Sequence, residues 1–345
     1  MAKPKSGASV SNAYIVFTDS LINPYTRKNY EICFDEFKKW LKTLEACNEL
    51  LTWEPRDLEN KIVSWIKELD KNGLATASIS LRISAIRIFF IENRAETHIN
   101  WKWLKARVPK NKGKTKDRDY EKDELVKTLN HTPDVRKRTI LLILMSGIRK
   151  GAIPDLRYGN ITKLTSYYDG RDERKFESYI YKLVVYENDG EYITFLTWEA
   201  SRALHMYIET RRTAGEKITP NSLLIRDSFN SLNASSAGPI TIAALDMLFT
   251  RLTRSAGIRT VGEAAERKEV MLFHGIRKYV NHAYVKARVE PAKKELLMGR
   301  AAPGREKEYL RATEEELLAE FVRAIPLLTL GAEEGPTSGA VLSSW

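Results

Sequence analysis

The sequence contains few cysteines, no long apolar run and no apolar leader. Its two cysteines, Cys33 and Cys47, lie fourteen positions apart without a neighbouring pair of metal ligands, which excludes a disulfide framework and a zinc site. No apolar stretch approaches the length of a transmembrane helix, and residues 1–12 lack the apolar segment of a signal peptide. We therefore expect a cytoplasmic protein, or a nuclear one in a host that has a nucleus, with no membrane partner.

Two patterns of cofactor binding are also missing. The sequence has no cluster of Asp and Glu spaced to hold two metal ions, and no glycine-rich loop of the kind that binds the phosphates of a nucleotide. We therefore expect neither a bound metal nor another cofactor.

Positive charge is what the sequence has in excess. The 345 residues include 56 Lys and Arg against 45 Asp and Glu, which gives a formal net charge of +11. Such an excess favours a polyanionic partner, through phosphate contacts and counterion release. Hydrophobic residues make up 43% of the chain, enough for a sizeable core, and the length predicts two domains.

The first hundred residues predict a small helical domain. Residues 1–22 look like a flexible leader, and from residue 23 onward apolar side chains recur at three- and four-residue steps in three segments. The first segment begins at Asn23-Pro24, and Gly73 follows the second as a helix-terminating residue. We predict a helical, DNA-binding domain over residues 23–100.

Residues 101–118 form the clearest boundary. No acidic residue occurs from Trp101 to Lys116, and Pro109 and Gly113 interrupt any helix. We interpret this segment as a basic linker that follows the DNA backbone, with a merely solvated linker as the alternative. Its candidate DNA-binding residues are Lys102, Lys105, Arg107, Lys110, Lys112, Lys114 and Lys116.

The second domain is expected over residues 119–328, followed by a disordered tail over 329–345. Two segments, 179–186 and 192–196, are rich in β-branched and aromatic residues and flank the turn sequence ENDG, which predicts a β-hairpin. Helices are predicted over 125–129, 138–146, 199–212, 242–256, 275–288, 292–298 and 314–324. The predicted fold class is mainly α with a small β-hairpin or sheet (α+β). The last helix is expected either to pack in its own core or to dock on a neighbouring copy.

Polar residues at the ends of these elements are candidates for chemistry. Arg149 follows a buried apolar helix, where its guanidinium needs an anion and can bind a phosphate with two hydrogen bonds. His274 and Arg277 lie three positions apart at a helix start, which attracts phosphate. Tyr309 follows Arg300 by nine positions. Each motif alone is common, since such arginines often form structural salt bridges and most tyrosines simply pack.

The ordered set of these residues resembles the catalytic set of the tyrosine recombinase, or phage integrase, family. The stretch SGIRKGAIPDLRYGNI is similar to the family's first box, whose arginine falls on Arg149, and His274 and Arg277 match the H-x-x-R of the second box. Met298-Gly299-Arg300 resembles the L-G-H segment, with Tyr309 at the position of the nucleophile. The helical unit and the basic linker resemble the family's core-binding domain, so the resemblance spans about residues 25–325.

Three positions fit the family less closely. The family's lysine belongs on a β-hairpin near the turn, and Lys182 is the best fit. Ala152 replaces an acidic residue that the family usually has three positions after the first arginine. Arg300 replaces a His or Trp, and arginine does not act as a base at pH 7, so the base role is expected to fall on His274 or on water.

The resemblance implies a site-specific recombinase or integrase of a mobile element. It implies that Tyr309 attacks double-stranded DNA to form a 3′-phosphotyrosyl bond and that Arg149, Arg277 and Arg300 bind the phosphate, with Lys182 as proton donor. It also implies a homotetramer assembled on DNA, without metal or ATP. The alternatives are a type IB topoisomerase with the same chemistry, and a catalytically degenerate DNA-binding protein, for which Ala152 and Arg300 are the sequence indications.

Overall fold

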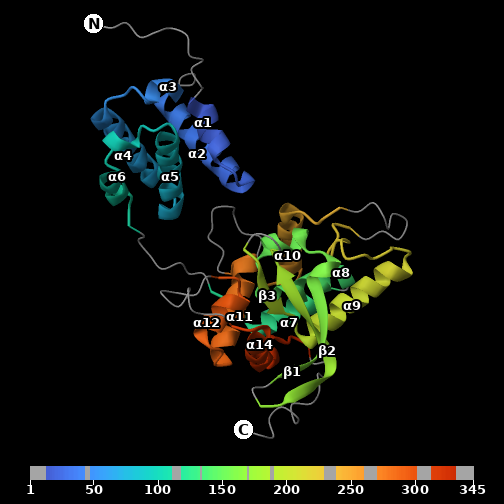
Figure 1. The fold of residues 1–345 in the computed structure, drawn as a ribbon. Coiled ribbons are helices and arrows are strands. Elements are labelled where there is room, and N and C mark those ends of the chain that lie inside the picture. The colour runs from blue at the N-terminus through green and yellow to red at the C-terminus, as the bar shows by residue number, and fades with distance from the viewer. Residues whose placement is uncertain are drawn as a thin grey trace. The chain divides into compact units, whose positions relative to one another are not determined.

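The chain divides into two units, residues 1–115 and 116–345, in the computed structural model (Figure 1). The structure describes residues 13–42, 47–110, 118–132, 134–168, 171–186, 190–228, 238–259, 270–300 and 312–331. None of the helices in these ranges is both long and apolar enough to cross a membrane.

The first unit is helical throughout its described part. Its elements are α1 (Ala13–Ser20), α2 (Pro24–Leu41), α3 (Cys47–Leu50), α4 (Pro55–Lys71), α5 (Thr76–Glu92), the 3-10 helix η1 (Glu96–His98) and α6 (Trp101–Arg107). Helix α2 begins at Pro24 because the side chain of Asn23 accepts hydrogen bonds from the next backbone N–H groups. Gly73 follows α4 with a φ of 76°, which glycine adopts without strain.

Two boundaries of this unit differ from the sequence prediction. Helix α1 lies within the expected leader because Phe17 is fully buried and packs on Phe34, with ring centroids 5.2 Å apart. Helix α6 lies within the expected linker because Leu104 is fully buried in the same unit, while the basic side chains of α6 face solvent. The first twelve residues and the second half of the linker lie outside the described residues.

The second unit combines helices with one small sheet, and the mainly helical α+β class is confirmed. Its elements are α7 (Lys122–Asn130), α8 (Val135–Leu144), the 3-10 helices η2 (Lys150–Asp155) and η3 (Tyr158–Asn160), β1 (Ile161–Tyr168), β2 (Glu173–Val185), β3 (Tyr192–Phe195), α9 (Trp198–Thr213), α10 (Ile242–Ser255), α11 (Leu272–Lys286), α12 (Pro291–Leu297) and α14 (Glu314–Leu328). Strand β1 was not predicted.

The sheet is antiparallel in the order β1-β2-β3, and its register defines two faces. Val185 pairs with Tyr192, and Lys182 pairs with Phe195. Because side chains alternate along a strand, Tyr192 and Phe195 point to opposite faces. The Phe195 ring lies 5.6 Å from that of Phe321 in α14, whereas the hydroxyl of Thr194, on the Tyr192 face, donates to the carbonyl of Ser146 just after α8.

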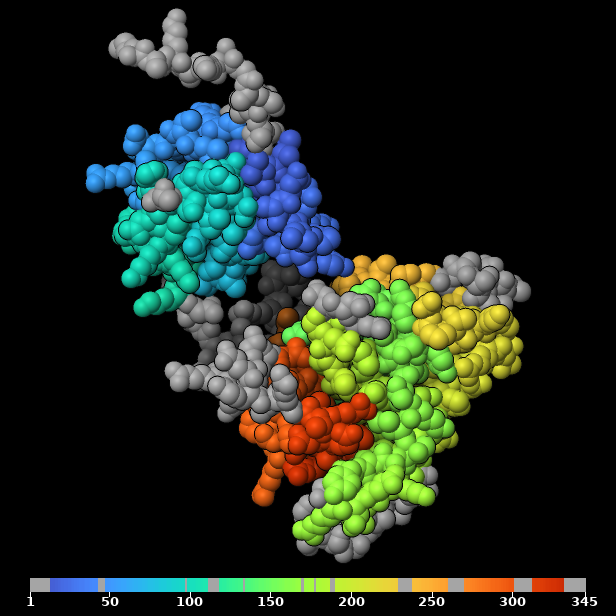
Figure 2. Space-filling view, in the orientation of Figure 1, coloured from blue at the N-terminus to red at the C-terminus, as the bar shows by residue number. Residues whose placement is uncertain are grey.

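Helix α14 packs against the sheet of its own unit. Phe321, Ala324 and Leu328 are fully buried, and Leu317 is nearly so. Figure 2 shows the red surface of α14 meeting the green surface of the sheet. Of the two expectations for this helix, the structure therefore supports packing in its own core.

A buried ion triad anchors the loop after α9. Arg211 and Arg226 are almost fully buried, and each guanidinium bonds one oxygen of Glu216 at 2.5 Å. Although burial opposes ionisation, the hydrogen bonds from both arginines hold the pKa of the Glu216 carboxyl below its usual range. Such a triad depends on all its members, because losing the carboxylate leaves two buried charges uncompensated.

Candidate active site

Arg277 joins three separate segments of the second unit. It projects from the second turn of α11, and its side chain is mostly buried. One terminal nitrogen donates to the carbonyl of Gly147, after α8, and the other donates to the carbonyl of Met298 at 2.7 Å. Two uncharged backbone carbonyls thus fix the guanidinium between the segment after α8 and the segment after α12.

Arg149 and Arg300 lie close to Arg277, and we call these three residues the arginine group. Arg149 is exposed, and its Nη1 donates to the carbonyl of Gly299 at 2.9 Å. Arg300 is the next residue in the chain, with its Nη1 3.5 Å from a carboxylate oxygen of Glu295. Burial, and then the positive charges of Arg149 and Arg300, lower the pKa of the Arg277 guanidinium. Three cations held close together in this way favour an anion with several oxygens, such as a phosphate.

His274 lies in the first turn of α11, one turn before Arg277. Its side chain is exposed, in contrast to that of Arg277. Backbone N–H groups at a helix start carry partial positive charge. His274 therefore lies one helical turn before Arg277, with its side chain open to solvent.

Two glycines permit this close approach of segments. Gly147 has a φ of 82°, and a Cβ there would lie 3.0 Å from Val280. Gly299 has a φ of 61°, and a Cβ there would lie 2.5 Å from Cζ of Tyr192, inside van der Waals contact. The ring of Tyr192 therefore packs directly on the backbone that accepts the hydrogen bond from Arg149.

Known proteins share this architecture. Residues 17–97 match the phage integrase N-terminal SAM-like domain, and no curated protein sequence matches the chain. The Tn1549 transposon integrase, solved with circular intermediate DNA, superposes with a TM-score of 0.58 at 14% identity, over 90% of this chain and 99% of that one. Lambda integrase, solved as a dimer bound to a core site, gives a TM-score of 0.56 at 16% identity, over 93% and 96%. The chain has the tyrosine recombinase fold. The resemblance drawn from the sequence is confirmed at this level.

Lys182 does not join the arginine group of this recombinase fold. It lies within β2, three residues before the strand ends, rather than at the turn. It shares the Phe195 face of the sheet, and its ammonium bonds the carboxylate of Glu314 in α14 at 2.9 Å. Because Tyr192 and the arginines lie toward the other face, the structure gives no support to Lys182 as the proton donor.

The remaining candidates divide between described and undescribed residues. Tyr309 and the linker lysines Lys112, Lys114 and Lys116 lie outside the described residues. Lys102, Lys105, Arg107 and Lys110 are all exposed, three of them on α6. Tyr284 in α11, another tyrosine of this unit, is completely buried, and burial raises the pKa of its phenol. A DNA phosphate could not reach Tyr284 in this fold.

Sequence reasoning overlooked two tyrosines beside the arginine group. Tyr186 directly follows β2 and Tyr192 begins β3, and their ring centroids lie 6.2 Å apart. Burial raises the pKa of Tyr192 to about 12, despite the opposing charge of Arg277. The available signal was their position: both flank the hairpin turn where the family places a functional side chain.

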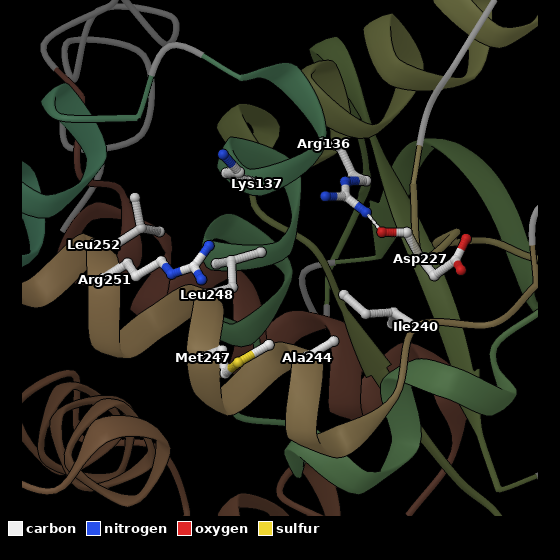
Figure 3. A pocket seen from close by; sticks show the side chains of 9 residues that line it. All are labelled: Arg136, Lys137, Asp227, Ile240, Ala244, Met247, Leu248, Arg251 and Leu252. Carbon is white, nitrogen blue, oxygen red and sulfur yellow. Dashed lines mark hydrogen bonds between the residues drawn. The ribbon is translucent and has the colours of Figure 1, made fainter.

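A separate cavity of about 180 Å³ lies between the start of α8 and α10 (Figure 3). Arg136 donates to the backbone carbonyl of Asp227 at its rim, and Met247 and Arg251 line it from α10. None of the candidate catalytic residues that the structure describes lines this cavity. It is therefore distinct from the arginine group.

Proposed function

We propose that the chain is a site-specific DNA recombinase, or integrase, that cleaves and rejoins DNA through a 3′-phosphotyrosyl bond to Tyr309. The observation that carries the proposal is the group of Arg149, Arg277 and Arg300, drawn together from three segments of a tyrosine recombinase fold. The charges of Arg149 and Arg277 are available to a ligand because these two side chains donate to carbonyl groups, whereas Arg300 is paired with Glu295.

The arginine group suits the charge that develops in phosphoryl transfer. A phosphodiester under attack gathers negative charge on its non-bridging oxygens, and preorganised donors aimed at those oxygens stabilise the transition state. Arg149 and Arg277 would bind these oxygens, with Arg300 adding a third donor. Because both are already oriented by Gly147, Met298 and Gly299, little reorganisation is needed when the phosphate arrives.

Proton transfer accompanies the attack. A phenol with a pKa near 10 is mostly protonated at pH 7, so the nucleophile Tyr309 must lose a proton as it reacts. His274, exposed one helical turn before Arg277, is the side chain that would accept it. Arg300 cannot, because a guanidinium has no acceptor.

Rejoining follows from the same chemistry in reverse. The 5′-hydroxyl of a second strand attacks the phosphotyrosyl bond, so the energy of the phosphodiester is retained and neither ATP nor a metal is required. Strand exchange between two duplexes involves four cut positions, and we propose a homotetramer on double-stranded DNA. Lambda integrase has been solved as a tetramer bound to a Holliday junction, at 17% identity and a TM-score of 0.55, which supports this assembly.

The first unit would supply DNA contacts. We propose that residues 23–100 form the core-binding domain and that the basic residues of 101–118 contact phosphates, with residues 119–328 as the catalytic domain. Lys102, Lys105 and Arg107 support this role, since all three are exposed on α6. Phosphate contacts of this kind orient a protein on DNA without reading its sequence.

A suicide substrate tests the proposal. A nicked duplex that loses its 5′-hydroxyl fragment after cleavage should trap the wild-type protein covalently on DNA, in excess EDTA, and Tyr309→Phe should trap nothing. Cleavage that requires magnesium would refute the mechanism. Binding without any adduct would favour the degenerate DNA-binding protein, and relaxation of supercoils without exchange between two duplexes would favour the type IB topoisomerase.

A further inference from the structure

The hairpin between β2 and β3 carries no basic proton donor. Cleavage releases a 5′-oxygen that needs a proton, and the resemblance places the donor near this turn. From Leu183 to Trp198 the sequence contains no lysine, arginine or histidine. Lys182 itself faces α14 and is paired with Glu314. The residues near the turn that carry an acidic hydroxyl are Tyr186 and Tyr192.

Tyr186 is placed over the first-box loop. It has a φ of 57°, in the left-handed region that non-glycine residues seldom adopt. This conformation interrupts the alternation of β2, and the ring of Tyr186 lies beside that of Tyr192. The Tyr186 hydroxyl lies 3.6 Å from the position of a Cβ on Gly151, two residues after Arg149. Backbone strain of this kind is common where a side chain has a specific function.

Tyr192 differs from Tyr186 in access. Its ring is pressed against Gly299, and its hydroxyl is buried against the guanidinium of Arg277. Tyr186 is only half-buried. A DNA strand bound to Arg149 could therefore reach the hydroxyl of Tyr186 but not that of Tyr192.

We propose that Tyr186 is the general acid that protonates the departing 5′-oxygen of the cleaved strand, in the role that the sequence had suggested for Lys182. This inference rests on the proposed function, because it concerns the same cleavage step. The proton donor is then the Tyr186 hydroxyl, which lies near the loop that carries Arg149.

The proton balance of the step is closed. As the bond from the Tyr309 oxygen to phosphorus forms, the Tyr309 proton passes to His274. The bond from phosphorus to the 5′-oxygen breaks, and the Tyr186 hydroxyl gives its proton to that oxygen. The resulting phenolate is stabilised by the nearby guanidinium groups. In rejoining, the incoming 5′-hydroxyl returns its proton to Tyr186 while it attacks phosphorus, and Tyr309 leaves and recovers its proton from His274.

The electrostatics of Tyr186 agree with an acid that is protonated before the reaction. Burial raises the pKa of its phenol, and Arg149 and Arg277 oppose that rise, while Asp155 adds to it. The proton is therefore present at neutral pH. The two arginines also favour the phenolate that donation leaves behind.

The test compares Tyr186→Phe on two suicide substrates, one with the natural 5′-bridging oxygen and one with sulfur in its place. A thiolate leaves without a proton, so a lost general acid matters only for oxygen. We expect Tyr186→Phe to slow single-turnover cleavage of the oxygen substrate about 100-fold, with little or no loss on the sulfur substrate. Tyr179→Phe, a half-buried tyrosine on the same strand, is the matched control and should cleave both normally.

Each other outcome is decisive. An equal partial loss of rate on both substrates, with the adduct still formed, would make Tyr186 a merely structural residue, and no loss on either would exclude it. Abolition of the adduct on both, as expected for Tyr309→Phe, would make Tyr186 a candidate nucleophile instead. If the sulfur substrate restored the cleavage rate of Lys182→Ala but not that of Tyr186→Phe, Lys182 would be the proton donor. A wild-type protein that forms no adduct on either substrate would refute the proposed function itself.

Discussion

Substituting Gly299 by alanine places a methyl group where two segments of the arginine group meet. The left-handed backbone alone costs a residue with a Cβ about 1–2 kcal/mol, and the new Cβ would lie 2.5 Å from Cζ of Tyr192. Overpacking of this kind costs about 1–3 kcal/mol. We therefore expect Gly299→Ala to lower the free energy of unfolding by about 2–5 kcal/mol in total, measured by urea denaturation.

The same change should reduce activity beyond its effect on stability. The carbonyl of Gly299 orients Arg149, and displacing a catalytic group by about 1 Å can cost about 100-fold in rate. Single-turnover cleavage at a temperature where the variant is folded measures this loss.

Gly215→Ala is the control for backbone strain, because Gly215 has a φ of 88° with nothing within 4 Å of its Cβ position. Equal destabilisation of the two variants, with cleavage intact in both, would refute the reasoning about Tyr192.

Three further predictions follow from other parts of the chain. Tyr309→Phe should leave DNA binding in a gel shift intact while removing the covalent adduct; a persistent adduct would place the nucleophile elsewhere. The fragment 1–118 should bind DNA without cleaving it and should weaken steeply as salt rises; binding that ignores salt would reduce residues 101–118 to a plain connection. Glu216→Gln should cost about 3–5 kcal/mol. Because the pKa of Glu216 is lowered in the folded state, its contribution is present at neutral pH and is lost as pH falls through that pKa; urea midpoints that decline equally with pH in wild type and variant would contradict this.

The helices were predictable because their apolar periodicity is strong, and the exceptions have identifiable causes. In α6 the single buried residue Leu104 is surrounded by basic residues, so charge concealed a short helix. Strand β1 is half-exposed and carries Lys163 and several polar residues, so its alternation is weak. In α1 the decisive contact of Phe17 is with Phe34 and Phe89, which are distant in sequence.

The site was predictable in composition but not in orientation. Arg149, Arg277 and Arg300 could be selected because their order and spacing match a known set. The face on which Lys182 lies depends on the strand register, and a shift by one residue reverses it. Only the pairing of Lys182 with Phe195, and the bond to Glu314, assign that side chain to the α14 face.

In this fold, cations differ in the groups to which they donate hydrogen bonds. That difference distinguishes charges that are already neutralised from charges that a ligand could neutralise. Arg211 and Arg226 are buried against the carboxylate of Glu216, and Lys182 is paired with Glu314, so these charges are neutralised where they lie. Arg149 and Arg277 instead donate to backbone carbonyls, which fix the direction of a guanidinium without cancelling its charge. Burial, and then the charges of Arg149 and Arg300, disfavour the charged form of Arg277, as the lowered pKa of its guanidinium shows. A bound phosphate would offset this unfavourable energy. We therefore propose catalysis at this group rather than at the tighter ion pairs elsewhere in the chain.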